Sequence, residues 1–323
     1  MAYTDFIPQN VAPQGARRIG IYNEQGNRVG QIPLGSLTPP FKGRKLYSFG
    51  ALSDVHLQYS TAQTDFQRAL TYLNEQEDVA FTCVCGDLTS GGTAEQMSAY
   101  KAAVDEYSPD TPVYAVSGNH ESWGGLDLTT AFEQYTGNPL YYSFTHGNDV
   151  FVMVGFANNT DTNIFTDAEL EWLAETLEAN KDKRVFLFEH VRPQDGCGNA
   201  LGLYKLDLWN GTQQTTFENL LRQYPNIVLF HGHSHLKFYL QTFADDANID
   251  KLFGCWSVHI PSIAVPRDTD GAVDPTAVDV YADSEGYVVD VYENGIHLRG
   301  RDFVKGEFLP IASYWLDTIW KDC

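Results

Sequence analysis

Short apolar runs and amphipathic stretches alternate along the first half of the chain. The apolar runs at 46–52, 79–85 and 112–116 predict buried strands, and small and polar residues follow each of them. Between these runs, the stretches 64–74 and 94–107 carry apolar residues at helical spacing. Strands that alternate with helices in this way predict βαβ units and a mostly parallel sheet.

The second half of the chain continues this pattern and then becomes rich in strands. Thr166 and Glu169 form a capping-box pattern at the start of a helix over residues 166–180. A hairpin before this helix and a strand, helix and strand after it are predicted at 141–144 and 150–156, and at 185–188, 215–223 and 227–230. Strand-like segments follow at 238–242, 256–260, 286–292 and 296–299. We therefore expect one α/β domain over residues 46–323.

Residues 1–45 differ from the rest of the chain. Segments 18–22 and 28–32 predict two strands joined by a loop that contains Gly26, which is typical of a β-hairpin. A lone hairpin is marginally stable without a surface to pack on. This favours an N-terminal hairpin that packs on the main domain, and the alternative is an element for attachment or oligomerisation.

The composition indicates a folded protein whose net charge disfavours binding to polyanions. Of the 323 residues, 43% are hydrophobic, which is enough for a large core and atypical of a disordered chain. The 42 acidic and 21 basic residues give a formal net charge of −21. This charge disfavours binding to nucleic acid or to an anionic membrane, which needs clustered positive charge. The sequence does not indicate an oligomeric state.

The sequence shows no signal for export or for membrane insertion. Its first residues have neither a basic region nor an apolar region of the signal-peptide type. No apolar run approaches the roughly 18 residues that a membrane span needs. Five cysteines are an odd number for a disulfide framework, and Cys83 and Cys85 are expected to be buried, reduced thiols. We therefore expect a soluble, cytoplasmic protein.

Five of the predicted strands are followed by residues whose side chains bind metal ions. The sequence Gly-Asn-His-Glu follows one strand at 118–121, and Gly-His-Ser-His follows another at 232–235. Open α/β sheets hold their active sites at the carboxyl ends of their strands, so the five groups are expected at such edges. In chain order they supply Asp54 and His56, Asp87, Asn119 and His120, His190, and His233 and His235. Carboxylate, imidazole and amide donors without a thiolate suit Zn, Mn or Fe.

Each of these groups also has an ordinary structural explanation. Taken alone, an Asp-x-His pair in a loop, a Gly-Asp turn or a helix-capping asparagine is common in proteins. His190 is the least specific member, because only its order and its strand end identify it. His231 is a competing candidate, since it also lies two residues from His233. The five groups indicate a site because they occur together, each after a predicted strand.

The ordered pattern D-x-H, G-D, G-N-H-E, H and G-H-x-H resembles that of the calcineurin-like metallophosphoesterase family over roughly residues 47–301. The resemblance implies a four-layer α/β/β/α sandwich of two mixed sheets, here with an N-terminal β-hairpin extension. It also implies a binuclear metal centre in which Asp87 bridges the two ions. One ion would be held by Asp54, His56, Asp87 and His235, and the other by Asp87, Asn119, His190 and His233.

The resemblance further implies an activity, that of a phosphodiesterase or phosphatase. Such an enzyme hydrolyses a phosphodiester or a small organic phosphomonoester with two transition metal ions, Mn, Fe or Zn. A hydroxide that bridges the ions would be the nucleophile, since metals lower the pKa of bound water. His120 would act on the leaving-group oxygen as a proton or hydrogen-bond donor. The alternative is a catalytically idle binding module of the same fold, docked to an assembly by its N-terminal hairpin.

Departures from two branches of the family narrow the expected activity. Purple acid phosphatases carry a tyrosine where Ser90 stands, and they lack the histidine found here at position 56. Periplasmic 5′-nucleotidases share the Gly-Asn-His-Glu and Gly-His-Ser-His motifs but need a separate C-terminal substrate domain. The about 88 residues after His235 are too few for one. Single-domain phosphodiesterases and phosphatases are the remaining group.

Residues near the motifs have supporting or structural interpretations. Glu121 is expected to orient His120 or a metal ligand, as metal-site imidazoles generally require. Arg192 and Arg267 lie in loops expected at the rim of the site, where either could grip a phosphate oxygen. The histidines outside the motifs are interpreted as structural or surface residues: His146, His259 and His297.

Overall fold

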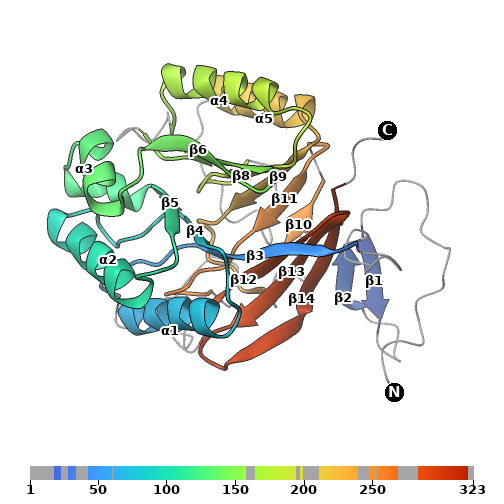
Figure 1. The fold of residues 1–323 in the computed structure, drawn as a ribbon, viewed down its shortest axis with the longest axis horizontal. Coiled ribbons are helices and arrows are strands. Elements are labelled where there is room, and N and C mark those ends of the chain that lie inside the picture. Colours follow the sequence, from blue (N-terminus) through green and yellow to red (C-terminus); the bar gives the residue numbers. More distant parts are fainter. Residues whose placement is uncertain are drawn as a thin grey trace.

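The structure, a computed structural model, describes residues 18–22, 28–33, 43–59, 61–157, 164–193, 197–198, 211–238, 248–251, 253–267 and 283–318. Two six-stranded sheets face each other, and helices lie on the outer face of each sheet (Figure 1). This arrangement confirms the predicted α/β/β/α sandwich of two mixed sheets.

The first sheet has the strand order β14-β13-β12-β3-β4-β5. Its parallel half contains β3 (Lys45–Leu52), β4 (Thr82–Cys85) and β5 (Val113–Val116), and its antiparallel half contains β12 (Glu285–Tyr292), β13 (Gly295–Asp302) and β14 (Glu307–Asp317). β12 pairs with β3 in antiparallel register and joins the two halves. The helices packed on this sheet are α1 (Ala62–Glu75), α2 (Ala94–Tyr107) and α3 (Leu128–Thr136).

The second sheet has the strand order β10-β11-β9-β8-β7-β6. Its four central strands are parallel: β7 (Asp149–Val154), β8 (Val185–Phe188), β9 (Ile227–His231) and β11 (Trp256–His259). Its two edges are antiparallel: β6 (Tyr141–His146) and β10 (Ile249–Asp250). The helices α4 (Asp167–Ala179) and α5 (Gly211–Gln223) pack on it.

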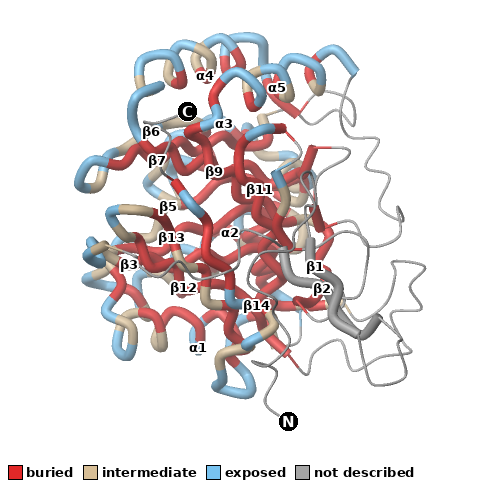
Figure 2. Tube along the Cα trace, turned by 90° about the vertical axis from the view of Figure 1, so that its right-hand side faces the viewer, coloured by how far each residue is buried: buried red, intermediate tan, exposed pale blue. Residues whose placement is uncertain are grey.

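The core lies in three apolar layers, one between the sheets and one under each set of helices. Aromatic rings fill much of the layer between the sheets. The ring of Phe49 lies 5.3 Å from those of Phe151 and Phe186, measured between centroids. Both faces of the parallel strands are covered, so β8 and β9 are buried at every position. Figure 2 shows this burial along the strands, with exposure confined largely to the outer turns of the helices and to loops.

The helix boundaries follow from capping residues that the sequence contains. Thr166 and Glu169 form the predicted capping box at the start of α4. Thr93 caps α2 by accepting a hydrogen bond from the backbone N–H of Gln96. None of the helices in the described part of the chain is long and apolar enough to cross a membrane.

The strand prediction succeeds at the parallel strands and misses two edge strands, β10 of the second sheet and β14 of the first. β1 (Arg18–Tyr22) and β2 (Arg28–Pro33) pair in antiparallel fashion, which confirms the predicted hairpin. The sequence analysis missed β14, which contains Pro310. The strand tolerates this proline because it lies at the edge of the sheet, where the register with β13 shifts. The strand predicted at 238–242 falls outside the described residues beyond Phe238.

A buried ion pair fastens the two sheets to each other. Arg184, which precedes β8, binds Asp149 of β7 through two hydrogen bonds of 2.9 and 2.6 Å. Asp149 also accepts a 2.6 Å hydrogen bond from the hydroxyl of Tyr47 in β3, on the other sheet. Arg184 donates in turn to the carbonyl of Tyr292 at the end of β12. Asp149 and Arg184 therefore each have hydrogen-bond partners on both sheets.

We expect Arg184→Met to lower the free energy of unfolding by about 3–5 kcal/mol, because Asp149 would keep a buried and unpaired charge. The measurement is urea unfolding followed by circular dichroism. The double variant Arg184→Met/Asp149→Asn should recover part of this loss, since it leaves no isolated charge. A single variant as stable as the wild type would show that the pair contributes little.

Candidate metal centre

The five predicted polar groups come together from both sheets. Three of them follow β3, β4 and β5 of the first sheet, and two follow β8 and β9 of the second. Backbone hydrogen bonds join neighbouring loops on each side. The N–H of Asp54 donates to the carbonyl of Gly86, and the N–H of Gly232 donates to the carbonyl of His190. The carboxyl ends of the parallel strands thus meet at one place, as predicted.

Two groups of side chains there have donor atoms close enough to share an ion. The first group comprises Asp54, His56, Asp87 and His235, and the second comprises Asp87, His190 and His233. Within each group the donor atoms lie within 4.8 Å of one another. In the first group, Nε2 of His235 lies 3.0 Å from both Asp54 Oδ1 and His56 Nε2. In the second group, Nε2 of His190 lies 3.1 Å from His233 Nδ1.

Asp87 belongs to both groups through a single oxygen atom. Its Oδ2 lies 3.1 Å from Nε2 of His190 and 3.6 Å from Nε2 of His56. Its Oδ1 is occupied, because it accepts a 2.9 Å hydrogen bond from the backbone N–H of His120. Asp54 is arranged in the same way. Its Oδ2 accepts from the hydroxyl of Ser53 and from the N–H of His233, which leaves Oδ1 facing His235.

Hydrogen bonds to carbonyl groups fix the tautomers of two histidines. Nδ1 of His190 donates to the carbonyl of Cys85 at 2.7 Å, so Nε2 is the ring nitrogen that faces Asp87. Nδ1 of His120 likewise donates to the carbonyl of Ser90 at 2.9 Å. Its Nε2 lies 3.7 Å from Asp87 Oδ2, beside the two groups. His190 is therefore oriented to bind a cation, and His120 is oriented to act next to one.

The donor set fits a pair of cations better than it fits an apo protein. In the first group, Asp54 Oδ1 is buried and has no hydrogen-bond partner among the described residues. Asn119 Oδ1 is buried and has no hydrogen-bond partner among the described residues. A buried acceptor without a partner costs about 1–3 kcal/mol. A cation at each group would pair these atoms.

Charges within the site shift the titration of its members in opposite directions. Burial would raise the pKa of Asp54, but His235 and His190 hold it below its ordinary value. Burial would lower the pKa of His190, but Asp87 and Asp54 raise it to about 10. Burial lowers the pKa values of His56 and His233 to about 3, so both rings are neutral at pH 7 and able to donate a lone pair.

The backbone of the site adopts a conformation that ordinary residues avoid. Seven non-glycine residues in the described part of the chain have positive φ angles, and five of these are candidate ligands. The five are Asp54, His56, Asp87, His233 and His235, with φ between 44° and 70°. The left-handed region costs such residues roughly 1–2 kcal/mol each. Strain of this kind clusters at functional sites, where the surrounding structure holds it.

The glycines of the motifs are needed because other groups fill the space of a side chain. A Cβ atom at Gly86 would lie 2.4 Å from the ring of His190. A Cβ atom at Gly118 would lie 2.2 Å from Asp87 Oδ1 and 2.4 Å from the Asp87 backbone nitrogen. At Gly232 it would lie 1.9 Å from the hydroxyl of Ser53 and 2.5 Å from Asp54 Oδ2. Each glycine lets one loop approach a candidate ligand carried by another.

Gly118→Ala should therefore displace Asp87 and lower kcat/KM on a phosphoester by about 10²-fold, the loss expected when a reacting group moves by about 1 Å. Gly211→Ala is the matched control, because nothing lies within 4 Å of that site and its φ is ordinary. Kinetics and thermal melting should be measured on both variants. Full activity in Gly118→Ala would show that the loops move to accept the added Cβ atom without displacing Asp87.

Glu121 joins two loops of the site rather than holding the ring of His120. Its carboxylate accepts hydrogen bonds from the N–H and hydroxyl of Thr89, both at 2.9 Å, and from the N–H of Gly118 at 2.8 Å. Burial raises the pKa of Glu121 to about 7. Of the two roles expected for Glu121, these contacts favour orienting a candidate ligand over orienting His120. It ties the loop after β4 to the loop after β5, and so fixes Asp87 relative to Asn119.

The other histidines lie outside both groups. His231, the competing candidate, is buried in β9 and lies 3.1 Å from the hydroxyl of Ser257. His259 lies at the end of β11, and its Nε2 is 2.7 Å from the hydroxyl of Ser234. It thus contacts the loop between His233 and His235, a supporting position that the sequence analysis did not assign. His146 packs on the rings of Tyr47 and Phe81, and His297 lies beside Ser313.

The two arginines have different positions. Arg192 is only 2% exposed and donates to the carbonyl of Pro193, so the expectation that it lies at the rim is wrong. Arg267 lies beside the site. Its backbone N–H donates to the carbonyl of His235 at 2.8 Å. Burial lowers its pKa, and Asp54 and Tyr59 are near enough to act on its charge.

A third group of carboxylates is already neutralised by lysines. Asp283, Glu285 and Asp302 are buried close together. Asp283 pairs with Lys237 and Lys305, and Lys305 also lies 2.9 Å from Asp302. Burial raises the pKa of Glu285 to about 8, so this side chain is largely protonated at pH 7. These pairs account for the group without an ion.

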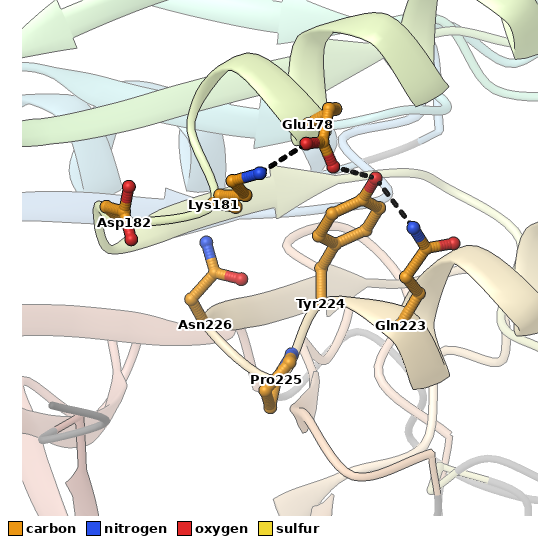
Figure 3. A pocket seen from close by; sticks show the side chains of 7 residues that line it. All are labelled: Glu178, Lys181, Asp182, Gln223, Tyr224, Pro225 and Asn226. Atoms are coloured by element: carbon orange, nitrogen blue, oxygen red, sulfur yellow. Dashed lines mark hydrogen bonds and ion pairs between the residues drawn. The ribbon is translucent and has the colours of Figure 1, made fainter. Parts of the chain in front are cut away.

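A surface cavity of about 690 Å³ lies away from the candidate centre. It is lined by residues at and just after the ends of two helices: Glu178 and Lys181 at the end of α4, and Gln223, Tyr224 and Asn226 at the end of α5 (Figure 3). These residues precede β8 and β9, whereas the candidate ligands follow the same strands. The hydroxyl of Tyr224 donates to Glu178 and accepts from Gln223, so the side chains pair with one another. The cavity has no part in the candidate chemistry.

The fold and the motifs identify the class of protein. A model of the calcineurin-like phosphoesterase family matches residues 47–237, more than half of the chain. The protein belongs to this family, as the sequence predicted. No curated protein sequence matches the chain.

Solved structures share the fold at low sequence identity. GAP50, described as the anchor in the inner membrane complex of Plasmodium, superimposes with a TM-score of 0.60 at 15% identity, over 86% of this chain and 91% of that one. The NAD nucleotidase NadN of Haemophilus influenzae gives a TM-score of 0.46 at 14% identity, over 84% of this chain and 50% of that one. Vps29 of Cryptosporidium parvum gives 0.39 at 13% identity, over 82% and 96%.

Proposed function

We propose that this protein hydrolyses a phosphodiester or a small organic phosphomonoester at a centre of two metal ions. The observation that carries the proposal is the position of Asp87 Oδ2, which lies between both groups of candidate ligands while Oδ1 is held by a backbone N–H. One ion is assigned to Asp54, His56, Asp87 and His235, and the other to Asp87, Asn119, His190 and His233. Their imidazole, carboxylate and amide donors suit Mn, Fe or Zn.

Two such ions, when bound, clamp the phosphoryl oxygens and lower the pKa of a bound water. The chain's own residues supply the rest of the chemistry. His120 presents Nε2 beside Asp87, and the carbonyl of Ser90 holds its Nδ1 proton. In its protonated form His120 can donate the Nε2 proton to the leaving alcohol. Arg267 supplies a positive charge near Asp54 and Tyr59 that can bind a phosphate oxygen.

The alternative is a module of the same fold that binds without catalysis. GAP50, the neighbour with a TM-score of 0.60, is described as an anchor. Two features favour an enzyme here. The two groups bring together four and three candidate ligands, and five of the candidate ligands hold a strained backbone that a scaffold alone does not require.

The test is to purify the protein without chelator, determine its metals by mass spectrometry, and assay bis(p-nitrophenyl) phosphate and p-nitrophenyl phosphate. Mn, Zn and Fe are supplied in turn. We expect two metals per chain and metal-dependent turnover of at least one ester. A chain that binds no metal and turns over neither ester under all three conditions would instead support the idle module.

A further inference from the structure

Two exposed aromatic side chains flank the candidate metal centre. Large hydrophobic side chains are exposed at four positions in the described part of the chain: Leu46, Tyr59, Trp123 and Val304. The two aromatic members are 38% and 60% exposed, and each follows a site histidine by three residues. A tryptophan that served only the core would be buried, because its ring contributes more apolar area than most side chains.

The rings of Tyr59 and Trp123 each lie next to the ring of a site histidine. The ring of Trp123 lies 3.8 Å from the ring of His120, between centroids, at an angle of 36°. The ring of Tyr59 lies 5.2 Å from that of His56. The rings of His56 and His120 are 4.5 Å apart. Tyr59, His56, His120 and Trp123 therefore form one row that begins and ends at exposed rings, with the candidate centre against its middle.

Trp123 is held on a rigid element. It lies in a short 3-10 helix, η3 (His120–Gly124). A Cβ atom at Gly124 would lie 1.9 Å from the carbonyl oxygen of Gly92, so the helix packs directly on the loop before α2. Ser122 donates its N–H to the carbonyl of Asn119 within the same turn. A ring that is already fixed binds a ligand at less entropic cost than one that must be ordered.

The position of His120 sets the direction of the leaving group. The leaving oxygen must come within hydrogen-bond reach of Nε2, which faces Asp87. The alcohol attached to that oxygen then extends toward solvent, along the rings beside His120. We propose that Trp123, whose ring lies against that of His120, binds a flat aromatic ring on this alcohol and selects phosphoesters that carry one. This inference rests on the proposed function, since it assigns a specificity surface to the same site.

The test compares 2-phenylethyl phosphate with 2-cyclohexylethyl phosphate, whose leaving groups are nearly equal in size and basicity. We expect the wild type to prefer the phenyl ester about tenfold in kcat/KM, because a flat ring can stack where a puckered one cannot. Trp123→Leu should remove this preference, mainly through KM, and Trp123→Phe should keep part of it. Val304→Ala is the control for the loss of an exposed apolar side chain.

Two outcomes would overturn the inference. One is a wild type without preference between the esters. The other is an equal loss on both esters in Trp123→Leu, which would mean that Trp123 only supports His120. Adenosine 5′-phosphate against ribose 5-phosphate, run in parallel, tells whether the preferred ring is a nucleobase or a simple aryl group.

A binding assay separates this inference from the proposed function. The matched phosphonates, 2-phenylethylphosphonate and 2-cyclohexylethylphosphonate, cannot be hydrolysed at a P–O–C bond. They are titrated by calorimetry into the metal-loaded protein. Tighter binding of the phenyl compound, lost in Trp123→Leu, would sustain the aromatic surface even if no ester is hydrolysed. Absence of binding by both compounds would overturn the aromatic surface, even in a protein that hydrolyses nitrophenyl esters.

Discussion

Asp87→Asn should release at least one of two bound metals and lower kcat/KM by about 10³-fold or more, because electrostatic stabilisation of this kind contributes at least 10²–10³. We expect this loss of metal and activity because only one oxygen of Asp87, Oδ2, is free to bind the ions. The N–H of His120 binds Oδ1, so the amide oxygen of the new side chain will take that position. Its NH₂ group then faces His190 and His56 in place of the shared oxygen. The substitution thus changes charge and donor type with almost no change in volume.

Metal content and kinetics should be measured on the same preparations of this variant. Asp78→Asn is a matched control, because Asp78 also has a positive φ but is exposed and lies outside both groups of candidate ligands. It should behave like the wild type. Two metals per chain in Asp87→Asn, at wild-type affinity, would remove Asp87 from the bridging position.

The sequence predicted the strands and loops of the site because both depend on local spacing. The apolar runs before the candidate ligands are short, and β4, β8 and β9 are buried at every position, whereas β5 is buried only at its last two. Parallel strands place their carboxyl ends at one edge. The order of the motifs was therefore enough to bring Asp54 and Asp87 together at one edge. His190 reaches them from the second sheet, an arrangement that the family resemblance implied and local spacing did not.

The roles of single atoms could not be predicted in this way. Either oxygen of Asp87 could have been shared between the groups, and only the hydrogen bond from His120 N–H distinguishes them. Glu121 could have oriented His120 or a metal ligand, and its partners are Thr89 and Gly118. The burial of Arg192 likewise depends on packing that local sequence does not encode. The shared oxygen of Asp87, the partners of Glu121 and the burial of Arg192 all depend on contacts between segments that are distant in sequence.

A partial sequence signal existed for one supporting residue that was missed. His259 ends an apolar strand, β11, just as His190 follows β8. It belongs to the same strand-end pattern, but it lies after the last family motif and was assigned a structural or surface role. Its contact with Ser234 places it behind the loop that carries His233 and His235. Trp123 had no comparable signal, because exposure cannot be read from spacing.

His120→Ala should leave both metals bound and still lower kcat/KM by about 10²–10⁴-fold on an alkyl phosphoester, the usual contribution of general acid catalysis. The loss should depend on the leaving group. An alkoxide needs a proton to depart, whereas a nitrophenolate departs without one, so the p-nitrophenyl ester should react nearly normally. The contact of Nδ1 with the carbonyl of Ser90 supports this role, since it orients Nε2 toward the site.

The measurement is kcat/KM on both esters for the wild type, His120→Ala and the control His297→Ala, with metal content determined on each sample. His297 is far from the motifs in sequence and lies beside Ser313, so its variant should match the wild type. An equal loss on both esters in His120→Ala would exclude the leaving-group role. A loss of metal would make His120 a ligand, and it would then replace His190, whose assignment from sequence depended only on its order and its strand end.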